Sequence, residues 1–500
     1  MIGQFGVGFY ASFIVADKVV VTTRRAGSPE KQGVRWCSSG EGSYEIEAVA
    51  CPQRGTTVVL HLKSNEEEFL NAWRLKQIIT KYSDHLTLPV VMKNDKNEEE
   101  TVNRATALWT LAKSEITDEQ YKEFYKHIAY DFEDPLVWVH NKVEGKTEYT
   151  TLLYIPSHAP FDLSRGNKTT GLKLYVKRVF ILDDAEQFLP NYLRFVKGIV
   201  DCNDLPLNIS REILQHHRLV ETIKSAITKR LLNLLEELTQ DKEKYQRFWS
   251  EFGQVLKEGI LEDFSNKEQI ASLLRFATTC TNKEKQETSL DDYITQMPPD
   301  QKKIYYLAAQ SFKAAKQSPH LEVFNKKGIE VLLLSEPIDE WLASHLSSYK
   351  DKPLQSITTE KLDLEDLSEE SQEALKQTKE TFSKLVGKIK EVLKDKVKDV
   401  RLSQRLTESP ACLISDEQGL SPQMEKIMRA SGQVVPLQKP ILEINPNHTI
   451  VQHLNREIEK PIFEDWAHVL FEQAILADGR QLEEPANFVK AFNDLLKTLL

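Results

Sequence analysis

The sequence predicts a multidomain protein of the α+β class. At 500 residues, the chain is long enough for about three domains of ~150 residues each. Hydrophobic residues make up 40% of the chain and charged residues 28%, which is the balance of a folded protein with substantial cores. Strand-like and helical patterns occur in separate blocks, and charged, polar stretches at 93–104 and 351–380 divide them. We therefore expect three domains joined by solvated linkers.

Residues 1–92 form the first predicted domain, which is rich in strands. An apolar run predicts a short helix at 9–16. A helix with acidic residues at its start is expected from 65 to about 85, and a short strand at 89–92. Alternating and β-branched residues, separated by glycine-rich turns, predict four more strands, at 19–23, 34–38, 44–49 and 56–62.

Residues 105–368 form the second predicted domain, an α/β unit that follows the charged linker 93–104. The patterns predict a helix at 115–129 and strands at 149–155 and 172–181. Helix is expected at 186–200 and again from about 211 to 276. The last part of this region predicts a helix, a strand and a helix, at 302–316, 328–334 and 337–348.

Residues 369–500 form the third predicted domain, which is mostly helical. A helix at 382–393 precedes short strands near 397–402, 411–415 and 441–444. Two amphipathic helices close the chain, because apolar residues recur there at i, i+3, i+4, i+7, i+8 and i+11. These residues are Phe463, Trp466, Ala467, Leu470, Phe471 and Ala474, and then Phe488, Ala491, Phe492, Leu495, Leu496 and Leu499.

Charge and cysteine content restrict the classes of partner. The formal net charge of −10 argues against nucleic-acid binding, which needs lysines and arginines gathered on one face. The five cysteines form no C-x-x-C pair and are odd in number, so neither a zinc site nor a disulfide framework is expected. Apolar runs such as 331–334 are far shorter than the ~20 residues that span a bilayer. A cytoplasmic protein that binds no membrane is predicted.

Three glycines near the start of the chain, Gly3-x-x-Gly6-x-Gly8, suggest an anion site. Glycine lets backbone N–H groups approach an anion closely, and a helix beginning near Phe9 would point its positive end at that anion. The spacing is neither the dinucleotide fingerprint nor a Walker A loop. A plain turn is the alternative interpretation of these glycines.

The second candidate segment is Leu205–Gln215. Ser210 is expected to cap a helix, which places Arg211 and Gln215 four residues apart on one face. An arginine there could reach a γ-phosphate held by another domain, as an arginine finger does. The alternative is a surface arginine paired with a carboxylate.

Two weaker candidates concern protein binding. Trp341 is either a core residue or an exposed aromatic that contacts partners. The segment 423–428 places Met424, Ile427 and Met428 on one helical face. Flexible methionines suit binding to varied partners, although packing in a core is an equally good interpretation.

Taken together, these segments resemble the heat-shock protein 90 chaperones over essentially the whole chain. Residues 2–10 (IGQFGVGFY) are similar to the ATP-lid signature of that family. The run 178–215 is similar to its middle-domain signature, as is Ala159-Pro160-Phe161-Asp162. Residues 318–322 and 327–332 follow in the family's order, and the short charged linker indicates the bacterial HtpG type.

The resemblance implies a homodimeric, ATP-driven chaperone for unfolded or partly folded client proteins, with co-chaperones as further partners. It implies a partial GHKL-type ATPase sandwich, an α/β middle domain and a C-terminal dimerisation domain, with ATP and Mg²⁺ as cofactors. Gly3, Gln4, Phe5, Gly6, Val7, Gly8 and Phe9 would contact the phosphates, Thr56 would lie in the pocket, Arg211 with Gln215 would reach the γ-phosphate, and Glu340 and Trp341 would contact clients.

One departure from the family concerns the remainder of the nucleotide pocket. In the family, the catalytic Glu, a Mg²⁺-binding Asn and an adenine-reading Asp precede the glycine lid, and none stands before Gly3 here. We therefore expect an incomplete ATP site and little or no ATP binding by this chain. A nucleotide-independent, dimeric client-binding protein is the alternative function. A DNA-repair or topoisomerase ATPase shares the lid motif, but the acidic net charge and the 205–215 segment disfavour it.

Overall fold

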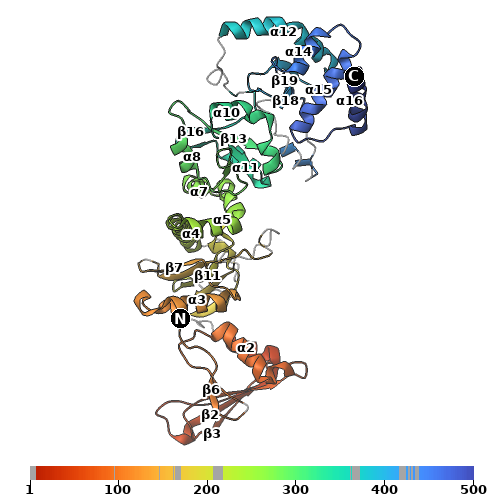
Figure 1. Cartoon of the computed structure of the whole chain (residues 1–500). Helices are drawn as coiled ribbons and strands as arrows, with labels where there is room; N and C mark the ends of the chain where they lie inside the picture. The colour runs from red at the N-terminus through yellow and green to blue at the C-terminus, as the bar shows by residue number, and fades with distance from the viewer. Residues whose placement is uncertain are drawn as a thin grey trace. The chain divides into compact units, whose positions relative to one another are not determined.

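The chain folds as two compact units in the computed structural model shown in Figure 1. The first comprises Met1–Pro156, Thr169–Leu189 and Val196–Ile227, and the second comprises Ser157–Lys168, Pro190–Phe195 and Thr228–Leu500. The predicted domain limits at 92, 104 and 368 stay predictions. The structure describes residues 7–94, 96–145, 147–161, 163, 171–205, 218–360, 362, 372–415, 424–425, 428–429, 432–433 and 438–499.

An antiparallel four-stranded sheet of order β3-β2-β1-β4 begins the first unit. In its central strand, Val21 pairs with Trp36 of β2 on one side and with Val58 of β4 on the other. Strand β4 is an edge strand whose Val58, Val59 and Leu60 are exposed. A 3₁₀ turn (Val7–Ala11) and α1 (Ser12–Val15) lead into the four predicted strands, which are confirmed as β1 (Ala16–Arg24), β2 (Gly33–Ser38), β3 (Glu45–Val49) and β4 (Gly55–Leu62).

A capped helix and a small hairpin follow this sheet. Helix α2 (Ala72–Ser83) begins where the Asn71 side chain accepts hydrogen bonds from the backbone N–H groups of Trp73 and Arg74. Strand β5 (Val91–Lys93) then pairs with β6 (Glu99–Thr101), so part of the segment predicted as a linker is a hairpin.

A five-stranded sheet of order β10-β9-β11-β8-β7 forms the centre of the first unit. Helix α3 (Asp118–Ala129) packs against it and buries Tyr121, Phe124 and Tyr125. Trp109 is fully buried beside α3, and its indole N–H donates to Asp201 at 2.8 Å. The strands are β7 (Val137–Val143), β8 (Tyr149–Ile155), β9 (Leu172–Val176), β10 (Val179–Leu182) and β11 (Lys197–Cys202).

Two sequence expectations in this sheet are wrong. The helix expected at 186–200 is replaced by short 3₁₀ turns and strand β11, because the β-branched Ile199 and Val200 are fully buried in the sheet. Gly198 has φ +146° there, and a Cβ on it would lie 2.2 Å from the Leu152 carbonyl oxygen. The single strand expected at 172–181 is instead a hairpin that turns at Lys177 and Arg178, both with positive φ.

Two buried histidines make the stability of the first unit depend on pH. Burial lowers the pKa of His85, although its hydrogen bond to the Thr106 carbonyl opposes this effect. Burial also lowers the pKa of His140, whose Nε2 donates to the Trp109 carbonyl and whose Nδ1 accepts from Tyr121. Both side chains are therefore neutral in the folded state at pH values where the unfolded chain already binds a proton.

We expect the free energy of unfolding to fall as the pH is lowered through about 6.5, the ordinary histidine pKa, because protonation then favours the unfolded state. Thermal unfolding of the full chain between pH 7.5 and 5 measures this slope. His85→Asn, which keeps a donor near Thr106, should flatten it, whereas the exposed His61→Asn should not. A slope that is the same in all three proteins would contradict the assignment.

Helices and a second five-stranded sheet form the first part of the second unit. The sheet has the order β12-β14-β13-β16-β15, with β12 (Ala277–Thr278), β13 (Ile304–Ala308), β14 (Leu332–Leu334), β15 (Ser348–Tyr349) and β16 (Lys352–Ser356). Helix α4 (Arg218–Leu238) begins in the first unit and continues into the second at Thr228. The other helices, several of which Figure 1 labels, are α5 (Lys242–Lys257), α6 (Gly259–Glu262), α7 (Lys267–Leu273), α8 (Leu290–Gln296), α9 (Phe312–Lys316), α10 (Glu322–Lys327) and α11 (Pro337–His345).

The helix predicted at 302–316 is also wrong in its first half. Ile304–Ala308 is β13, which pairs in parallel with β14 and β16, and helix α9 begins only at Phe312. Ile304 and Leu307 are buried, and the aromatic and β-branched side chains of this run fit a pleated sheet better than a helix. The strand and the helix predicted after it are confirmed as β14 and α11.

The last part of the second unit packs helices on a three-stranded sheet of order β17-β19-β18. Its core contains Leu385, Leu442, Trp466 and Leu470. No described helix is both long and apolar enough to cross a membrane. The elements are α12 (Gln372–Val392), β17 (Asp399–Leu402), β18 (Ala411–Ile414), β19 (Ile441–Ile444), α14 (Thr449–Arg456), α15 (Phe463–Ala477) and α16 (Pro485–Leu499).

Candidate functional site

The structure describes only part of the glycine segment. Gly3, Gln4, Phe5 and Gly6 lie outside the described residues, whereas Val7 begins the first 3₁₀ turn. The Phe9 ring packs edge-on against Trp36 with 5.5 Å between ring centroids. A Cβ at Gly8 would meet no atom within 4 Å, so a side chain would fit there.

Thr56 lies on strand β4 of the first sheet. Its hydroxyl is hydrogen-bonded to the Thr23 hydroxyl across β1 and β4 at 2.7 Å. Because Val21 pairs with Trp36 and Thr23 pairs with Thr56, the side chains of Trp36 and Thr56 point to the same face of the sheet.

The described residues of this region include only some of the predicted nucleotide contacts. They offer a hydroxyl at Thr56 that is already hydrogen-bonded, and the backbone of Gly8. No cluster of three or more His, Cys, Asp or Glu side chains that could hold a metal ion occurs among the described residues. Arg211 and Gln215 lie outside the described residues, so their predicted contact with a γ-phosphate stays a prediction.

Helix α11 carries the predicted client-binding pair. Trp341 is 39% exposed, whereas the neighbouring Glu340 is only 8% exposed. The surface alternative therefore holds for Trp341, while Glu340 faces the interior. Burial raises the pKa of Tyr306 to about 12, and the nearby charge of Glu340 adds to this effect. Their predicted joint contact with clients stays a prediction.

A buried lysine, which the sequence analysis missed, lies under α11. Lys257 ends α5 with a fully buried side chain, and its Nζ donates to Asp339 at 2.7 Å and to Glu336 at 2.8 Å. Burial alone would lower the pKa of Lys257, but the two carboxylates outweigh it and raise the pKa above its ordinary value. The lysine is therefore charged, and it joins α5 to the start of α11.

The sequence carried a faint signal for this lysine. Trp249, Gly253 and Lys257 recur at i, i+4 and i+8, so they form one stripe along α5. A lysine at the end of such a stripe normally reaches solvent, and only the contacts with α11 show that it does not.

The two candidate methionines differ in exposure. Met424 is buried at 7% exposure, and Met428 is partly buried. Residues 426–427 between them lie outside the described residues, so the shared helical face stays a prediction.

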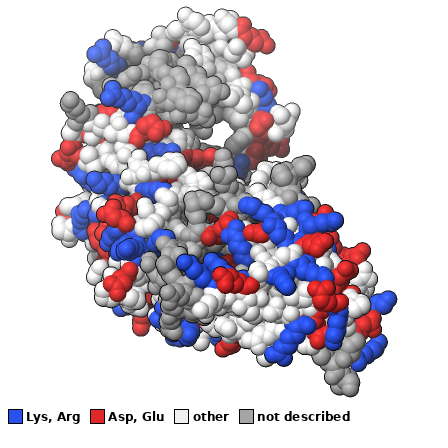
Figure 2. Space-filling view, turned by 90° about the horizontal axis from the view of Figure 1, so that it is seen from above, with Lys and Arg blue, Asp and Glu red and all other residues white. Residues whose placement is uncertain are grey.

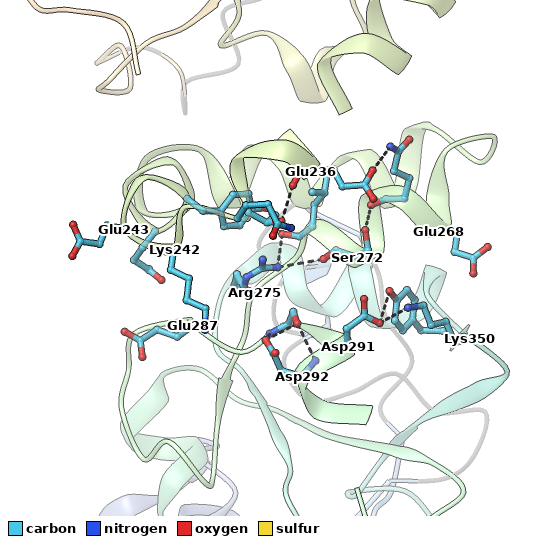
Figure 3. A pocket seen from close by; sticks show the side chains of 18 of the residues that line it. Glu236, Lys242, Glu243, Glu268, Ser272, Arg275, Glu287, Asp291, Asp292 and Lys350 are labelled. Carbon is cyan, nitrogen blue, oxygen red and sulfur yellow. Dashed lines mark hydrogen bonds and ion pairs between the residues drawn. The ribbon is translucent and has the colours of Figure 1, made fainter. Parts of the chain in front are cut away.

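A polar cavity of about 970 Å³ lies between α5, α7 and the 285–292 segment (Figure 3). At its centre, the Arg275 guanidinium lies 4.4 Å from the Tyr245 ring centroid and donates to the carbonyls of residues 272–274. Lys350 is paired with Asp291 at 2.6 Å. These two cations are held by the protein itself, and we assign the cavity no ligand.

Figure 2 shows the charges of the described residues on one face of the molecule. Lysine and arginine side chains alternate there with aspartates and glutamates, and neither sign gathers over a wide area. A protein that binds nucleic acid broadly needs one basic face.

The two C-terminal helices use their apolar faces differently. On α15, the six apolar residues of the predicted face are all buried within the chain's own core. On α16, Leu495 is buried, but Val489 and Leu496 are 54% and 43% exposed. Of the described residues of the predicted face, Leu496 is therefore the exposed one, and Val489, which the prediction did not include, lies on the same side of α16.

Comparison with known proteins identifies the family. The family model described as Hsp90 protein matches residues 91–500. The chain is 56% identical to the chaperone protein HtpG of Paraburkholderia xenovorans (strain LB400), 57% to that of Coxiella burnetii (strain RSA 331 / Henzerling II) and 56% to that of Legionella pneumophila (strain Paris). Each match covers 99% of this chain and 80% of the relative. The chain therefore belongs to the Hsp90 family, and within it to the bacterial HtpG type of molecular chaperone.

Proposed function

We propose that the chain binds unfolded or partly folded client proteins and that Trp341 is a principal contact. The supporting observation is a large aromatic side chain, 39% exposed, on a helix whose opposite side is fixed by buried contacts. Rigid, exposed tryptophans contribute strongly to protein–protein binding, because they bury much apolar area and lose little conformational entropy.

Replacement of Trp341 by alanine tests this proposal. We expect Trp341→Ala to weaken the binding of a permanently unfolded client by about 1–2 kcal/mol, which is roughly five- to thirtyfold in Kd. Fluorescence anisotropy of a labelled, reduced and alkylated lactalbumin measures it. The matched control is Trp73→Ala, because Trp73 is 67% exposed but lies in the first unit. Equal affinity of Trp341→Ala and the unchanged chain would refute the role of Trp341.

Further client contacts are proposed at the methionines. Met428 is only partly buried and is therefore better placed to meet a client than Met424. A direct contact of Glu340 with clients is not proposed, since its side chain is mostly covered.

The proposed assembly is a homodimer formed through α16. Its support is the exposed stripe of Val489 and Leu496, which lies on a helix anchored by the buried Leu495. In this proposal residues 369–500 are the dimerisation domain, residues 105–368 the middle domain and residues 1–92 a part of the nucleotide domain, joined by the linker 93–104.

We also propose the ATP-dependent cycle of the family for this chain. It would use the backbone of residues 3–9, with Thr56, Arg211 and Gln215 as the remaining contacts. Client binding that is independent of ATP is the alternative, and it would require none of these phosphate contacts. Co-chaperones would act as additional partners.

A further inference from the structure

Helix α11 is oriented by the residues on its buried side. Asp339 and Leu342 are almost fully buried, whereas Trp341 is 39% exposed. Successive residues of a helix are separated by about 100°, so Trp341 lies about 200° around the axis from Asp339. A contact that holds Asp339 against the interior therefore also sets the direction in which Trp341 points.

The contact that holds Asp339 is the Lys257 ammonium group. Every carboxylate oxygen around that group is used: Asp339 Oδ1 and Glu336 Oε2 accept from Lys257, and Asp339 Oδ2 accepts from the Glu336 backbone N–H at 3.0 Å. Glu336 Oε1 accepts from Gln286 at 3.0 Å. The cluster thus fixes where α11 begins and how the helix is rotated about its axis.

The surroundings of Lys257 restrict it to this position. Its Nζ lies 5.8 Å from the ring centroids of both Trp249 and Phe276. Trp249 in turn donates from its indole N–H to Gln286 at 2.9 Å. The Trp249 ring lies along α5 over Gly253, where an added Cβ would come within 2.7 Å of it.

Buried ion clusters of this kind contribute little net stability, because the cost of removing charges from water offsets their attraction. Their replacement by uncharged side chains of similar size is often neutral, although removal of one charge alone is costly. The cluster of Lys257, Glu336 and Asp339 can therefore select the orientation of α11 without being needed for the fold.

We propose that Lys257 is a positioning residue for client binding, because its contacts with Glu336 and Asp339 hold α11 in the rotation that exposes Trp341. This inference rests on the proposed client contact of Trp341. It assigns to Lys257 an effect on client affinity that is separable from an effect on stability.

A triple variant separates the two effects. Lys257→Met, Glu336→Gln and Asp339→Asn together remove all three charges, and asparagine at 339 can still cap the helix. We expect this variant to unfold at nearly the same denaturant concentration as the unchanged chain, but to bind labelled, reduced and alkylated lactalbumin about tenfold more weakly. The matched control is Lys142→Met with Glu144→Gln, which removes an exposed ion pair.

Two further measurements show whether the effect arises from orientation. Amide hydrogen exchange in the triple variant should increase within residues 337–345 and stay unchanged elsewhere. Lys257→Arg, which keeps the charge and offers two donors to the carboxylates, should bind the client more tightly than Lys257→Met does. A general rise in exchange throughout the second unit would show a merely structural role and overturn the inference.

The Trp341→Ala variant separates the proposed role of Lys257 from the proposed client contact of Trp341 on which it rests. If Trp341→Ala weakens client binding but the triple variant binds normally, Lys257 has no positioning role and the proposed contact stands. If Trp341→Ala binds normally, the proposed contact fails and the role of Lys257 fails with it. If both variants bind weakly while the triple variant remains stable, the inference is supported.

Discussion

Arg405→Met should lower the free energy of unfolding by about 3–5 kcal/mol, because it leaves a buried carboxylate without its counter-charge. The Arg405 side chain is 1% exposed, and its Nε donates to Glu443 Oε2 at 2.9 Å. Its Nη1 donates to the Ile357 carbonyl and its Nη2 to the Thr359 carbonyl. Arg405 therefore ties the 357–359 segment to strand β19, and methionine replaces none of these donors.

Urea denaturation followed by circular dichroism measures this loss. Arg401→Met is the matched control, because Arg401 is 40% exposed in its side chain and pairs with Glu360 and Asp399 near the surface. That change should cost no more than about 1 kcal/mol. Equal midpoints for the two variants would show that burial does not distinguish the two arginines.

Leu496→Glu should turn the proposed dimer into monomers, with a rise in dimer Kd of about a hundredfold or more, because a carboxylate would be buried at an apolar contact. Leu496 is 43% exposed and lies on the same side of α16 as Val489, two helical turns further along. The neighbouring Leu495, at 2% exposure, packs within the chain, so the substitution at 496 leaves the core intact.

Analytical ultracentrifugation over a range of protein concentrations gives the dimer Kd. Lys497→Glu is the control, since the Lys497 side chain is 75% exposed and pairs only locally with Asp494. If the Leu496→Glu protein stays dimeric at the lowest concentration, the dimer interface does not include this stripe of α16. Monomers in the unchanged chain would remove the dimer from the proposal altogether.

Elements with a strong periodic pattern could be predicted from the sequence. Helices α15 and α16 have apolar residues on one stripe, and β4 is a long β-branched run, so each was placed within a few residues. The run 197–202 was missed because its short apolar stretch cannot be told from buried helix by period alone. Ile304–Ala308 failed for the same reason.

Candidate sites were harder to predict, because chemistry depends on contacts between distant segments. The exposure of Trp341 was one of two open alternatives, and the structure decides it. Lys257 and Asp339 lie 82 residues apart in the chain, and no local pattern pairs them. The burial of the α15 face likewise depends on β18 and α12, which pack on it from elsewhere in the sequence.

Strand β4 gives the chain something in common with the proteins it is proposed to protect. Within the described part of the chain, β4 is an edge strand with exposed valines and a leucine, which is the kind of surface that recruits other strands. The residues from Gly55 to Leu62 include no acidic residue and no lysine or arginine that would discourage such pairing. The exposed edge of β4 therefore offers another strand a place to pair.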